Sequence, residues 1–384
     1  GMKYFYTSKL INNDINRFPH SLFKWQGIDG TKIPAYLERI NYNGDINPRC
    51  VIDEYQRFDE KDIFDKTFVP FGFGDGGGGP TYEMLEFAKR MKEFPGLPKT
   101  EINTAASYFN DVDKVVDVLE VWNDEMYYEF HRGTYTSQAN VKKNNRKSEL
   151  LYRESEILNS IVNREYNEKY PMDELTSGWK TILLNQFHDI IPGSSINCVY
   201  EDCAKDYDKV LQIGERAKRT ALKSIINQVK VDNDSVLVFN TLSWTRAESV
   251  DIELPNSKYN SVVEADGTII ASCVKKVDGK SILSFIAKNV PPMGYKVFKL
   301  CESKYESSNS YNSNNENKAN NAIFVSKSLL ENDYIKVAVR NGNIISVYDK
   351  KQKRNIIVDG GYANKLVIFE DRPERESAWN IDLE

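Results

Sequence analysis

The sequence predicts a multidomain α+β protein, from its length and from the order of its local patterns. Its 384 residues suffice for two or three domains of ordinary size. Short apolar runs broken by Gly and Pro fill residues 1–110, amphipathic helical patterns fill the middle, and strand-like runs follow Val231. We therefore expect a strand-and-helix domain, a helical domain and a β domain, in that order.

The first domain is expected to span residues 1–125 and to contain a βα unit. Residues 68–71 have the composition of a buried strand, and a run of glycines follows them. Apolar side chains then recur at helical spacing at Tyr82, Leu85, Ala88 and Met91. A strand, a glycine turn and a helix are the order of parts in a βα unit.

The middle domain, residues 126–230, is predicted to hold three amphipathic helices. Their apolar stripes lie within residues 150–162, 175–190 and 207–229. Pro192-Gly193 should end the second helix, and Ser195 is a candidate N-cap for the third. Short breaks between such helices favour an antiparallel three-helix bundle.

The last domain, residues 231–384, is predicted to be all β. Strand-like runs occupy residues 236–239, 250–254 and 334–339, and Asn341-Gly342 is a hairpin turn signal. Residues 303–321 are nearly all Ser, Asn, Tyr, Lys and Glu, which predicts a flexible loop without a function of its own. The domain reaches Glu384 before any obvious closure, so we expect a partial β-sandwich.

Composition excludes some functions. The net charge of −5 argues against a nucleic-acid binder, and the densest basic stretch, residues 142–147, is interpreted as the solvated start of a helix. No apolar run approaches the roughly 18 residues of a membrane span. The five cysteines are scattered and never spaced as Cys-x-x-Cys, which suits reduced thiols. With no signal peptide at Met2, a cytoplasmic location is expected.

The glycine-rich segment 71–81 is the most unusual part of the sequence. Six of its eleven residues are glycine, so its backbone can approach a ligand closely. Asp75 is its one ionisable side chain and could protonate a leaving group in a sugar cleft. Two other interpretations stay open: a phosphate loop, which the absence of a following Lys-Ser/Thr disfavours, and a flexible turn with a surface aspartate.

Three histidines are present, His20, His131 and His188. If the second helix runs to Ile190, His188 lies opposite its apolar stripe and faces solvent or another domain. With Asp189 beside it, it could be a metal ligand. On residue types alone, a surface or interface histidine with one hydrogen bond is the more common case.

Segment 130–138 could supply guanidinium and hydroxyl contacts to a sugar, from Arg132, Tyr135 and their neighbours. It could equally be a helix-entry loop in which Thr and Ser act as caps, and residue types slightly favour the cap.

Taken together, these segments resemble glycoside hydrolase family 38 α-mannosidases. The matching stretches occur in family order at residues 18–20, 25–30, 70–81, 131–137, 144–147, 183–195, 238–244, 370–373 and 378–382. The glycine run and Asn185-Gln186-Phe187-His188-Asp189 are individually specific.

The resemblance implies the remnant of a (β/α) barrel catalytic domain, a three-helix bundle and a partial β-sandwich. It implies retaining hydrolysis of terminal α-mannosides of oligomannosides, with a zinc ion that grips two sugar hydroxyls. By resemblance, His188 is a metal ligand and Asp75 the general acid/base. Asp189 contacts the substrate, and Arg132 and Tyr135 are further candidates for substrate binding.

The family pattern is incomplete here. No His-x-Asp occurs at any of the three histidines, and the nucleophile motif Asp-x-Phe-Gly is absent because Val69-Pro70 precedes Phe71-Gly72. Retaining chemistry needs two carboxylates about 5 Å apart, and a catalytic zinc typically has about three protein ligands. We therefore expect a chain that lacks the first half of the catalytic domain, is inactive alone, and binds zinc weakly or not at all.

Two alternatives to an inactive enzyme fragment stay open. One is a carbohydrate-binding or scaffold module. The other is half of a split enzyme, because truncated barrel strands would leave a sheet edge that favours pairing with an upstream half or a second copy.

Overall fold

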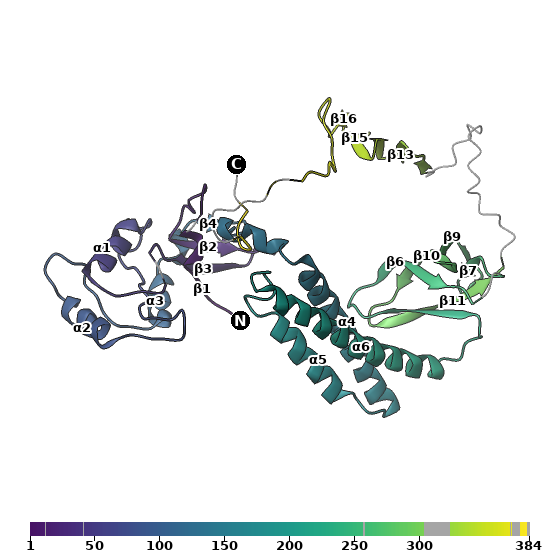
Figure 1. Ribbon diagram of the computed structural model, residues 1–384, viewed down its shortest axis with the longest axis horizontal. Helices are drawn as coiled ribbons and strands as arrows, with labels where there is room; N and C mark the ends of the chain where they lie inside the picture. Colours follow the sequence, from purple (N-terminus) through teal and green to yellow (C-terminus); the bar gives the residue numbers. More distant parts are fainter. Residues whose placement is uncertain are drawn as a thin grey trace. The chain divides into compact units, whose positions relative to one another are not determined.

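The computed structural model describes residues 1–11, 13–40, 42–255, 258–302, 323–368, 370 and 377–381. It combines helices with several sheets, as the sequence predicts (Figure 1). The chain divides into two compact units. Unit 1 comprises Gly1–Lys142, Phe187–Tyr200 and Arg372–Glu384, and unit 2 comprises Lys143–Gln186 and Glu201–Asp371.

Unit 1 contains a four-stranded mixed sheet of order β1-β3-β2-β4. Strands β2 and β3 pair antiparallel, whereas β1 pairs with β3 and β4 with β2 in parallel. The strands are β1 (Phe5–Thr7), β2 (Leu22–Gln26), β3 (Lys32–Leu37) and β4 (Val121–Trp122). Gly30, at φ +84°, turns the β2–β3 hairpin. That this four-stranded sheet is the remnant of a (β/α) barrel stays a prediction.

Side chains on alternate positions of this sheet enter two cores, because successive strand residues face opposite sides. Leu22 and Tyr36 lie in one core, and Phe23, Ala35 and Leu37 lie in the other.

The helices and 3-10 helices of this part are η1 (Lys9–Ile11), α1 (Pro48–Arg57), α2 (Tyr82–Met91), α3 (Ala105–Val112), η2 (Val116–Val118) and η3 (Glu129–Tyr135). Helix α2 confirms the predicted helix, and its N-cap Thr81 accepts a hydrogen bond from the Met84 amide at 3.3 Å.

The predicted strand at residues 68–71 is wrong. The Phe68 amide donates to the Tyr36 hydroxyl at 3.2 Å, and Pro70 has no amide hydrogen, so no strand ladder forms. One isolated antiparallel bridge remains, between Gly44 and Gly72.

Two buried carboxylates fasten the sheet to its surroundings. Glu54 of α1 accepts from the Tyr36 hydroxyl at 2.6 Å and from the Arg39 amide at 3.1 Å. Glu60 accepts from the amide of Leu22 at 2.8 Å and contacts the His20 imidazole at 3.3 Å. Burial raises the pKa of both carboxyl groups. His20 therefore has a structural partner.

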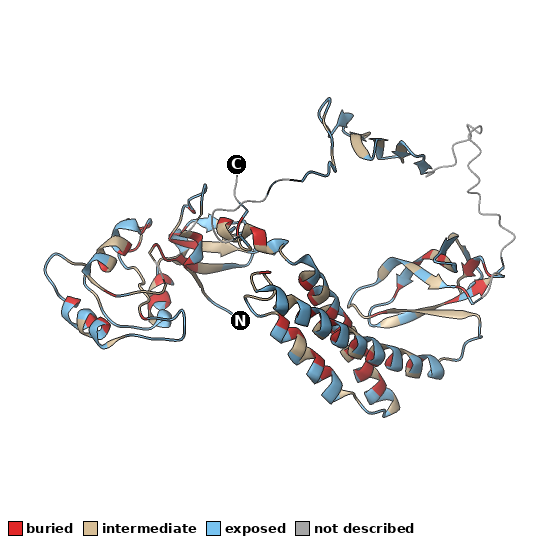
Figure 2. Cartoon of the chain, in the orientation of Figure 1, coloured by how far each residue is buried: buried red, intermediate tan, exposed pale blue. Residues whose placement is uncertain are grey.

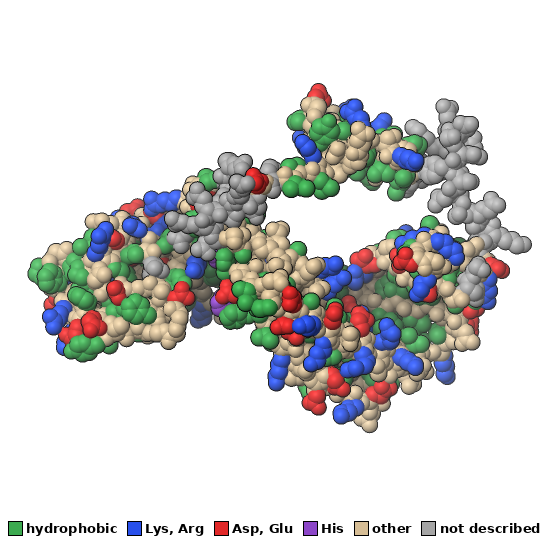
Figure 3. All heavy atoms as spheres, in the orientation of Figure 1, with side chains coloured by type: hydrophobic (Ala, Val, Ile, Leu, Met, Phe, Trp, Pro, Cys, Tyr) green, Lys and Arg blue, Asp and Glu red, His purple; other side chains and the backbone are tan. Residues whose placement is uncertain are grey.

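The helices of the middle region are α4 (Ala139–Tyr166), α5 (Met172–Asn185) and α6 (Asn197–Gln228). Their shared core, red on the inner faces in Figure 2, consists of Leu151, Tyr152, Leu175, Ile182, Val210 and Ala217. Its centre is tight because the Tyr152 hydroxyl donates to the Val210 carbonyl at 2.9 Å and the ring lies against Gly178 and Gly214. Acidic and basic side chains are interspersed over these helices on the face seen in Figure 3.

The second helix ends five residues earlier than predicted, at Asn185. The Asn185 side-chain amide donates to the Thr181 carbonyl at 3.0 Å, four residues back, and such a local bond competes with helix propagation. The side chain of Gln186 donates instead to Asn145 of α4 at 2.9 Å. Leu183, assigned to the apolar stripe, is 59% exposed. The predicted helical position of His188 is therefore wrong, because the residue follows the helix.

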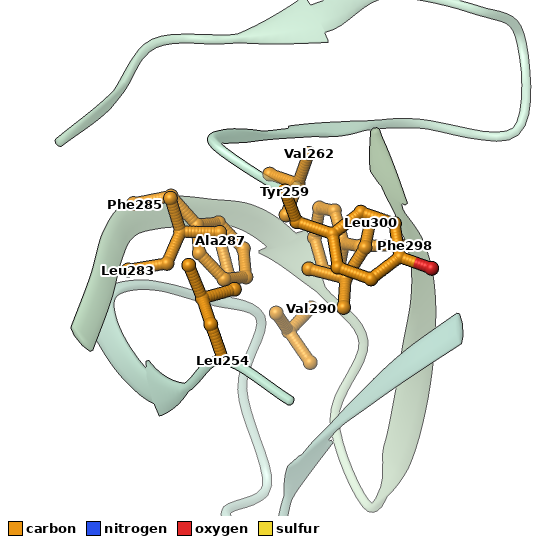
Figure 4. Packing of buried hydrophobic residues seen from close by; sticks show 9 residues of the cluster. All are labelled: Leu254, Tyr259, Val262, Leu283, Phe285, Ala287, Val290, Phe298 and Leu300. Atoms are coloured by element: carbon orange, nitrogen blue, oxygen red, sulfur yellow. The ribbon is translucent and has the colours of Figure 1, made fainter. Parts of the chain in front are cut away.

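The β part of unit 2 begins with two sheets, of order β6-β10-β9 and β5-β11-β7-β8. Their strands are β5 (Ser235–Asn240), β6 (Arg246–Glu253), β7 (Ser261–Val263), β8 (Ile269–Ile270), β9 (Ser272–Val277), β10 (Lys280–Val290) and β11 (Gly294–Cys301). Side chains from both sheets form one core, in which Phe285 of β10 packs edge-on against Phe298 of β11 at 5.1 Å between ring centroids (Figure 4).

A third, antiparallel sheet has the order β12-β13-β14-β15-β16. Its strands are β12 (Phe324–Val325), β13 (Leu329–Glu331), β14 (Ile335–Arg340), β15 (Asn343–Asp349) and β16 (Arg354–Asn355). Asn341 and Gly342, at φ +50° and +79°, form the predicted turn between β14 and β15. The three predicted strands coincide with β5, β6 and β14. The predicted loop 303–321 lies outside the described residues.

No helix among the described residues has the length and apolar character that a bilayer crossing requires.

Replacing Gly178 by Ala is expected to destabilise unit 2 by about 1–3 kcal/mol, because a Cβ there would lie 1.8 Å from the Tyr152 hydroxyl. Urea unfolding followed by tryptophan fluorescence measures the change, since Trp179 packs against Tyr152. Ser177→Ala, at an exposed position of the same helix, is the matched control. Equal stability of both variants would contradict this account of the core.

Candidate active site

The His188–Asp189 turn follows α5 in the sequence and belongs to unit 1. The amides of Ile190 and Ile191 donate to the Phe187 carbonyl at 2.8 and 3.1 Å, which makes residues 187–191 a compact turn. The His188 side chain is 77% exposed, and its Nε2 lies 3.5 Å from an Asp189 carboxylate oxygen. The predicted metal ligand and its neighbouring substrate residue thus lie together and open to solvent.

Serine side chains after the turn fix Asp189. Ser195 Oγ donates to the Asp189 carbonyl at 2.6 Å, and Ser194 Oγ donates to the Asp189 carboxylate at 3.1 Å. Ser195 is therefore not the predicted N-cap of α6, which begins at Asn197. Its hydroxyl holds the preceding turn instead.

The same turn is fastened to residues 131–137. Gly193, at φ +94°, lies so close that a Cβ there would be 2.6 Å from Ser137 Cβ. Lys142 Nζ donates to the carbonyls of Ile191, at 2.7 Å, and Ser137. Burial lowers the pKa of this lysine. Sequence reasoning placed Lys142 in a solvated stretch, because a lysine's carbonyl partners cannot be recognised from composition.

Arg132 and Tyr135 differ in exposure. Arg132 is 12% exposed, forms an ion pair with Asp14, and donates from Nε to Asn380 Oδ1 at 2.9 Å. Tyr135 is 65% exposed. The guanidinium is thus engaged inside the protein, whereas the tyrosine ring is open to solvent.

The predicted capping role of this segment is wrong. Thr134 Oγ1 donates to the His131 carbonyl at 2.6 Å, and Ser137 Oγ donates to the Gly133 carbonyl at 2.9 Å. Both hydroxyls therefore serve carbonyl groups, whereas an N-cap accepts from an amide. Helix α4 begins only after Gln138, whose φ is +52°.

Glu129, at the start of η3, binds the loop that contains Asp14. Its carboxylate accepts from the amides of Ile15 at 2.7 Å and Asn16 at 3.1 Å, and from the Asn16 side chain at 2.7 Å. The Ile15 amide is the main cause that lowers the pKa of Glu129, since it favours the charged form. Sequence reasoning missed this residue because its partners lie more than a hundred positions away.

Asp75 lies in an exposed glycine loop of unit 1. Asn43 Oδ1 accepts from the amides of Gly74 at 2.9 Å and Asp75 at 3.2 Å, and the Phe73 amide donates to the Gly79 carbonyl at 3.1 Å. A Cβ at Gly78 would lie 2.4 Å from the Phe73 carbonyl, so the loop requires glycine. The glycine loop is thus held by Asn43 and by the Gly44 carbonyl, which accepts from the Gly72 amide at 3.0 Å, whereas His188 contacts Asp189 and Phe187.

A zinc ion, which the resemblance implies, can be tested against the donors present. No group of three His, Cys, Asp or Glu side chains suited to a metal occurs within the part of the chain that the structure describes. His188 and Asp189 provide two donors, fewer than the three or so of a catalytic zinc site. The described residues therefore do not fit a complete zinc site.

Three family models match separate parts of the chain, in family order. They are the glycosyl hydrolases family 38 N-terminal domain at residues 1–125, the alpha mannosidase middle domain at 129–225, and the glycosyl hydrolases family 38 C-terminal domain at 330–384. The chain belongs to glycosyl hydrolase family 38.

Relatives of this family 38 chain match along its length. Alpha-mannosidase G of Dictyostelium discoideum is 29% identical over 415 residues, which cover 100% of this chain and 37% of that protein. Alpha-mannosidase 2C1 of Homo sapiens is 28% identical, covering 99% and 34%. Alpha-mannosidase of Saccharomyces cerevisiae is 33% identical, covering 68% and 25%. The chain spans about a third of the length of the first two relatives.

A solved structure shares the fold of the family 38 chain. The crystal structure of an alpha-mannosidase from Enterococcus faecalis V583 matches with a TM-score of 0.53 at 16% identity, covering 88% of this chain and 43% of that one.

Glu129 predicts a pH dependence. Because its pKa is lower in the folded state, it contributes stability that is present above its unfolded value, near 4.5, and lost as pH falls through the folded pKa. Glu129→Gln should therefore be less stable than wild type at neutral pH, with a difference that shrinks as the pH falls below 4.5. Thermal unfolding across this range measures it. Glu125→Gln, at an exposed position, is the control, and a difference that is constant with pH would refute the assignment.

Proposed function

We propose that this chain takes part in the hydrolysis of terminal α-mannosides of oligomannosides, by a retaining mechanism. The family 38 models and the α-mannosidase relatives along the whole chain support this activity. The observation that carries the proposal is structural. Segments 131–137, 187–195 and 377–381, far apart in the sequence, pack together in unit 1 and leave His188, Asp189 and Tyr135 accessible.

Each accessible side chain has a proposed role. His188 offers an exposed imidazole nitrogen to a metal, and Asp189 offers a serine-oriented carboxylate to sugar hydroxyls. Tyr135 offers an aromatic face and a hydroxyl to the same sugar. Arg132 reaches a substrate only through guanidinium edges not used by Asp14 and Asn380, so its main contribution is to hold its segment.

Asp75 is the proposed general acid/base. Protonation of the glycosidic oxygen requires a carboxyl group that reaches the leaving group without bulky neighbours, and the glycine loop supplies that access. Retaining hydrolysis also needs a second carboxylate as nucleophile, for which the sequence offers no family motif.

The 384 residues taken by themselves are proposed to be inactive and to hold no stoichiometric zinc, because nucleophile and metal ligands must be added to those described. The domain limits 1–125, 126–230 and 231–384 stay part of this proposal, with the positions of the family models as support. A cytoplasmic location is also proposed, since all five cysteines are free thiols.

The purified chain is expected to show no turnover of 4-nitrophenyl α-mannoside, with or without added zinc. Joined by a second polypeptide that contains the family's His-x-Asp and Asp-x-Phe-Gly motifs, it should gain activity, because the missing donors are then present. Activity should be lost in Asp75→Asn and His188→Ala and retained in His20→Gln, whose side chain contacts Glu60.

Turnover by the chain alone that Asp75→Asn abolishes would contradict the proposed inactivity. Saturable binding of mannose, measured by calorimetry, with no turnover in any combination would instead favour a carbohydrate-binding module.

A further inference from the structure

We infer that residues 377–381 form a positioning strap, which orders segment 131–137 and, through Ser137, the His188–Asp189 turn. The functional importance of that turn rests on the proposed function, but the strap and its contacts do not. The strap belongs to unit 1 together with both segments that it orders.

The strap binds first to Arg132 and Gly133. The Gly133 amide donates to the Trp379 carbonyl at 2.9 Å, and Arg132 Nε donates to the Asn380 side chain at 2.9 Å. A Cβ on Gly133 would lie 3.0 Å from the carbonyl oxygens of both Trp379 and Asn380. The two backbones are therefore in direct contact, and Asn380 is 8% exposed.

The strap also supplies an aromatic contact. The Trp379 ring lies 4.6 Å from the His131 imidazole, which also contacts the Tyr128 ring at 4.3 Å. Aromatic neighbours at this spacing add to the stabilisation that comes from buried area. The His131 imidazole thus packs between the ring of Tyr128, three residues before it, and the sequence-distant ring of Trp379.

Ser137 transmits the order of the strap to the turn. Its hydroxyl lies 2.9 Å from the Gly133 carbonyl and 3.0 Å from the Ala378 carbonyl, so it contacts both its own segment and the strap. Ser137 also lies against Gly193. The Ser137 carbonyl accepts a hydrogen bond from Lys142 Nζ, which donates as well to the Ile191 carbonyl of the turn. A shift of Ser137 therefore moves the turn that presents His188.

The strap lies 248 positions from Arg132 along the chain, so ordering it costs loop-closure entropy. Its contacts are directional: two carbonyls, a side-chain amide and an indole ring each meet one defined group. Directional contacts fix one position of the strap against segment 131–137, whereas non-directional apolar packing would allow several. Trp379 and Asn380 are thus positioning residues, which act through segment 131–137 and not on a substrate.

The three imidazoles allow a direct test by NMR on the 384-residue chain, because their ring signals can be assigned by substitution. Trp379→Ala should move the signals of His131, its neighbour, and also those of His188, while those of His20 stay in place. Trp379→Phe should return the His188 signals toward wild type, since it keeps a ring against His131. Trp244→Ala, at a 59% exposed tryptophan of unit 2, should move none.

Asn380→Ala provides a second variant that keeps the indole, in case Trp379→Ala unfolds unit 1 and moves all three sets of signals. It should speed amide exchange of Gly133 about fivefold or more and move the His188 signals. Signals of His188 that stay unchanged while those of His131 move would overturn the strap's role. This readout needs neither zinc nor turnover, so its failure is distinct from failure of the proposed activity.

Discussion

The close approach of three backbones at Ser137 is the constraint on which the candidate site depends. Gly193 and Gly133 leave no room for side chains where they face Ser137 and residues 377–381. Because both positions are bare backbone, hydrogen bonds from Lys142 and Ser137 can span the junction. Because a closely packed interior transmits displacements, the position of the turn with His188 and Asp189 depends on the packing at Ser137.

The exposed and buried charges of unit 1 have different tasks. Glu54, Glu60 and Glu129 are buried and accept backbone or hydroxyl hydrogens, so they hold loops and strands together. Asp75 and His188 lie on exposed turns held by backbone amides and neighbouring side chains. Rigid support with an open side chain is what a binding or catalytic group requires. Among the described residues, these carboxylates form no cluster suited to a metal ion.

Sequence patterns predicted the parts that depend on local periodicity. Helix α2, the three middle helices and strands β5, β6 and β14 follow from apolar spacing, and Asn341-Gly342 from turn chemistry. The errors arose where side chains compete with the backbone. The Asn185 side-chain amide bonds the Thr181 carbonyl where α5 ends, before the apolar pattern ends. The Tyr36 hydroxyl accepts the Phe68 amide hydrogen that a strand would need.

From the sequence alone, the motifs with Asp75, His188 and Asp189 were recognisable, because specific residue types at fixed spacing mark the family. Membership of family 38 followed from them. Only the tertiary structure decided that Arg132 forms an ion pair with Asp14 and that Lys142 bonds the Ile191 carbonyl. It also decided that Trp379 and Asn380 contact segment 131–137. The physical reason is distance along the chain: hydrogen bonds and ring contacts between residues up to 248 positions apart leave no periodic trace in the sequence.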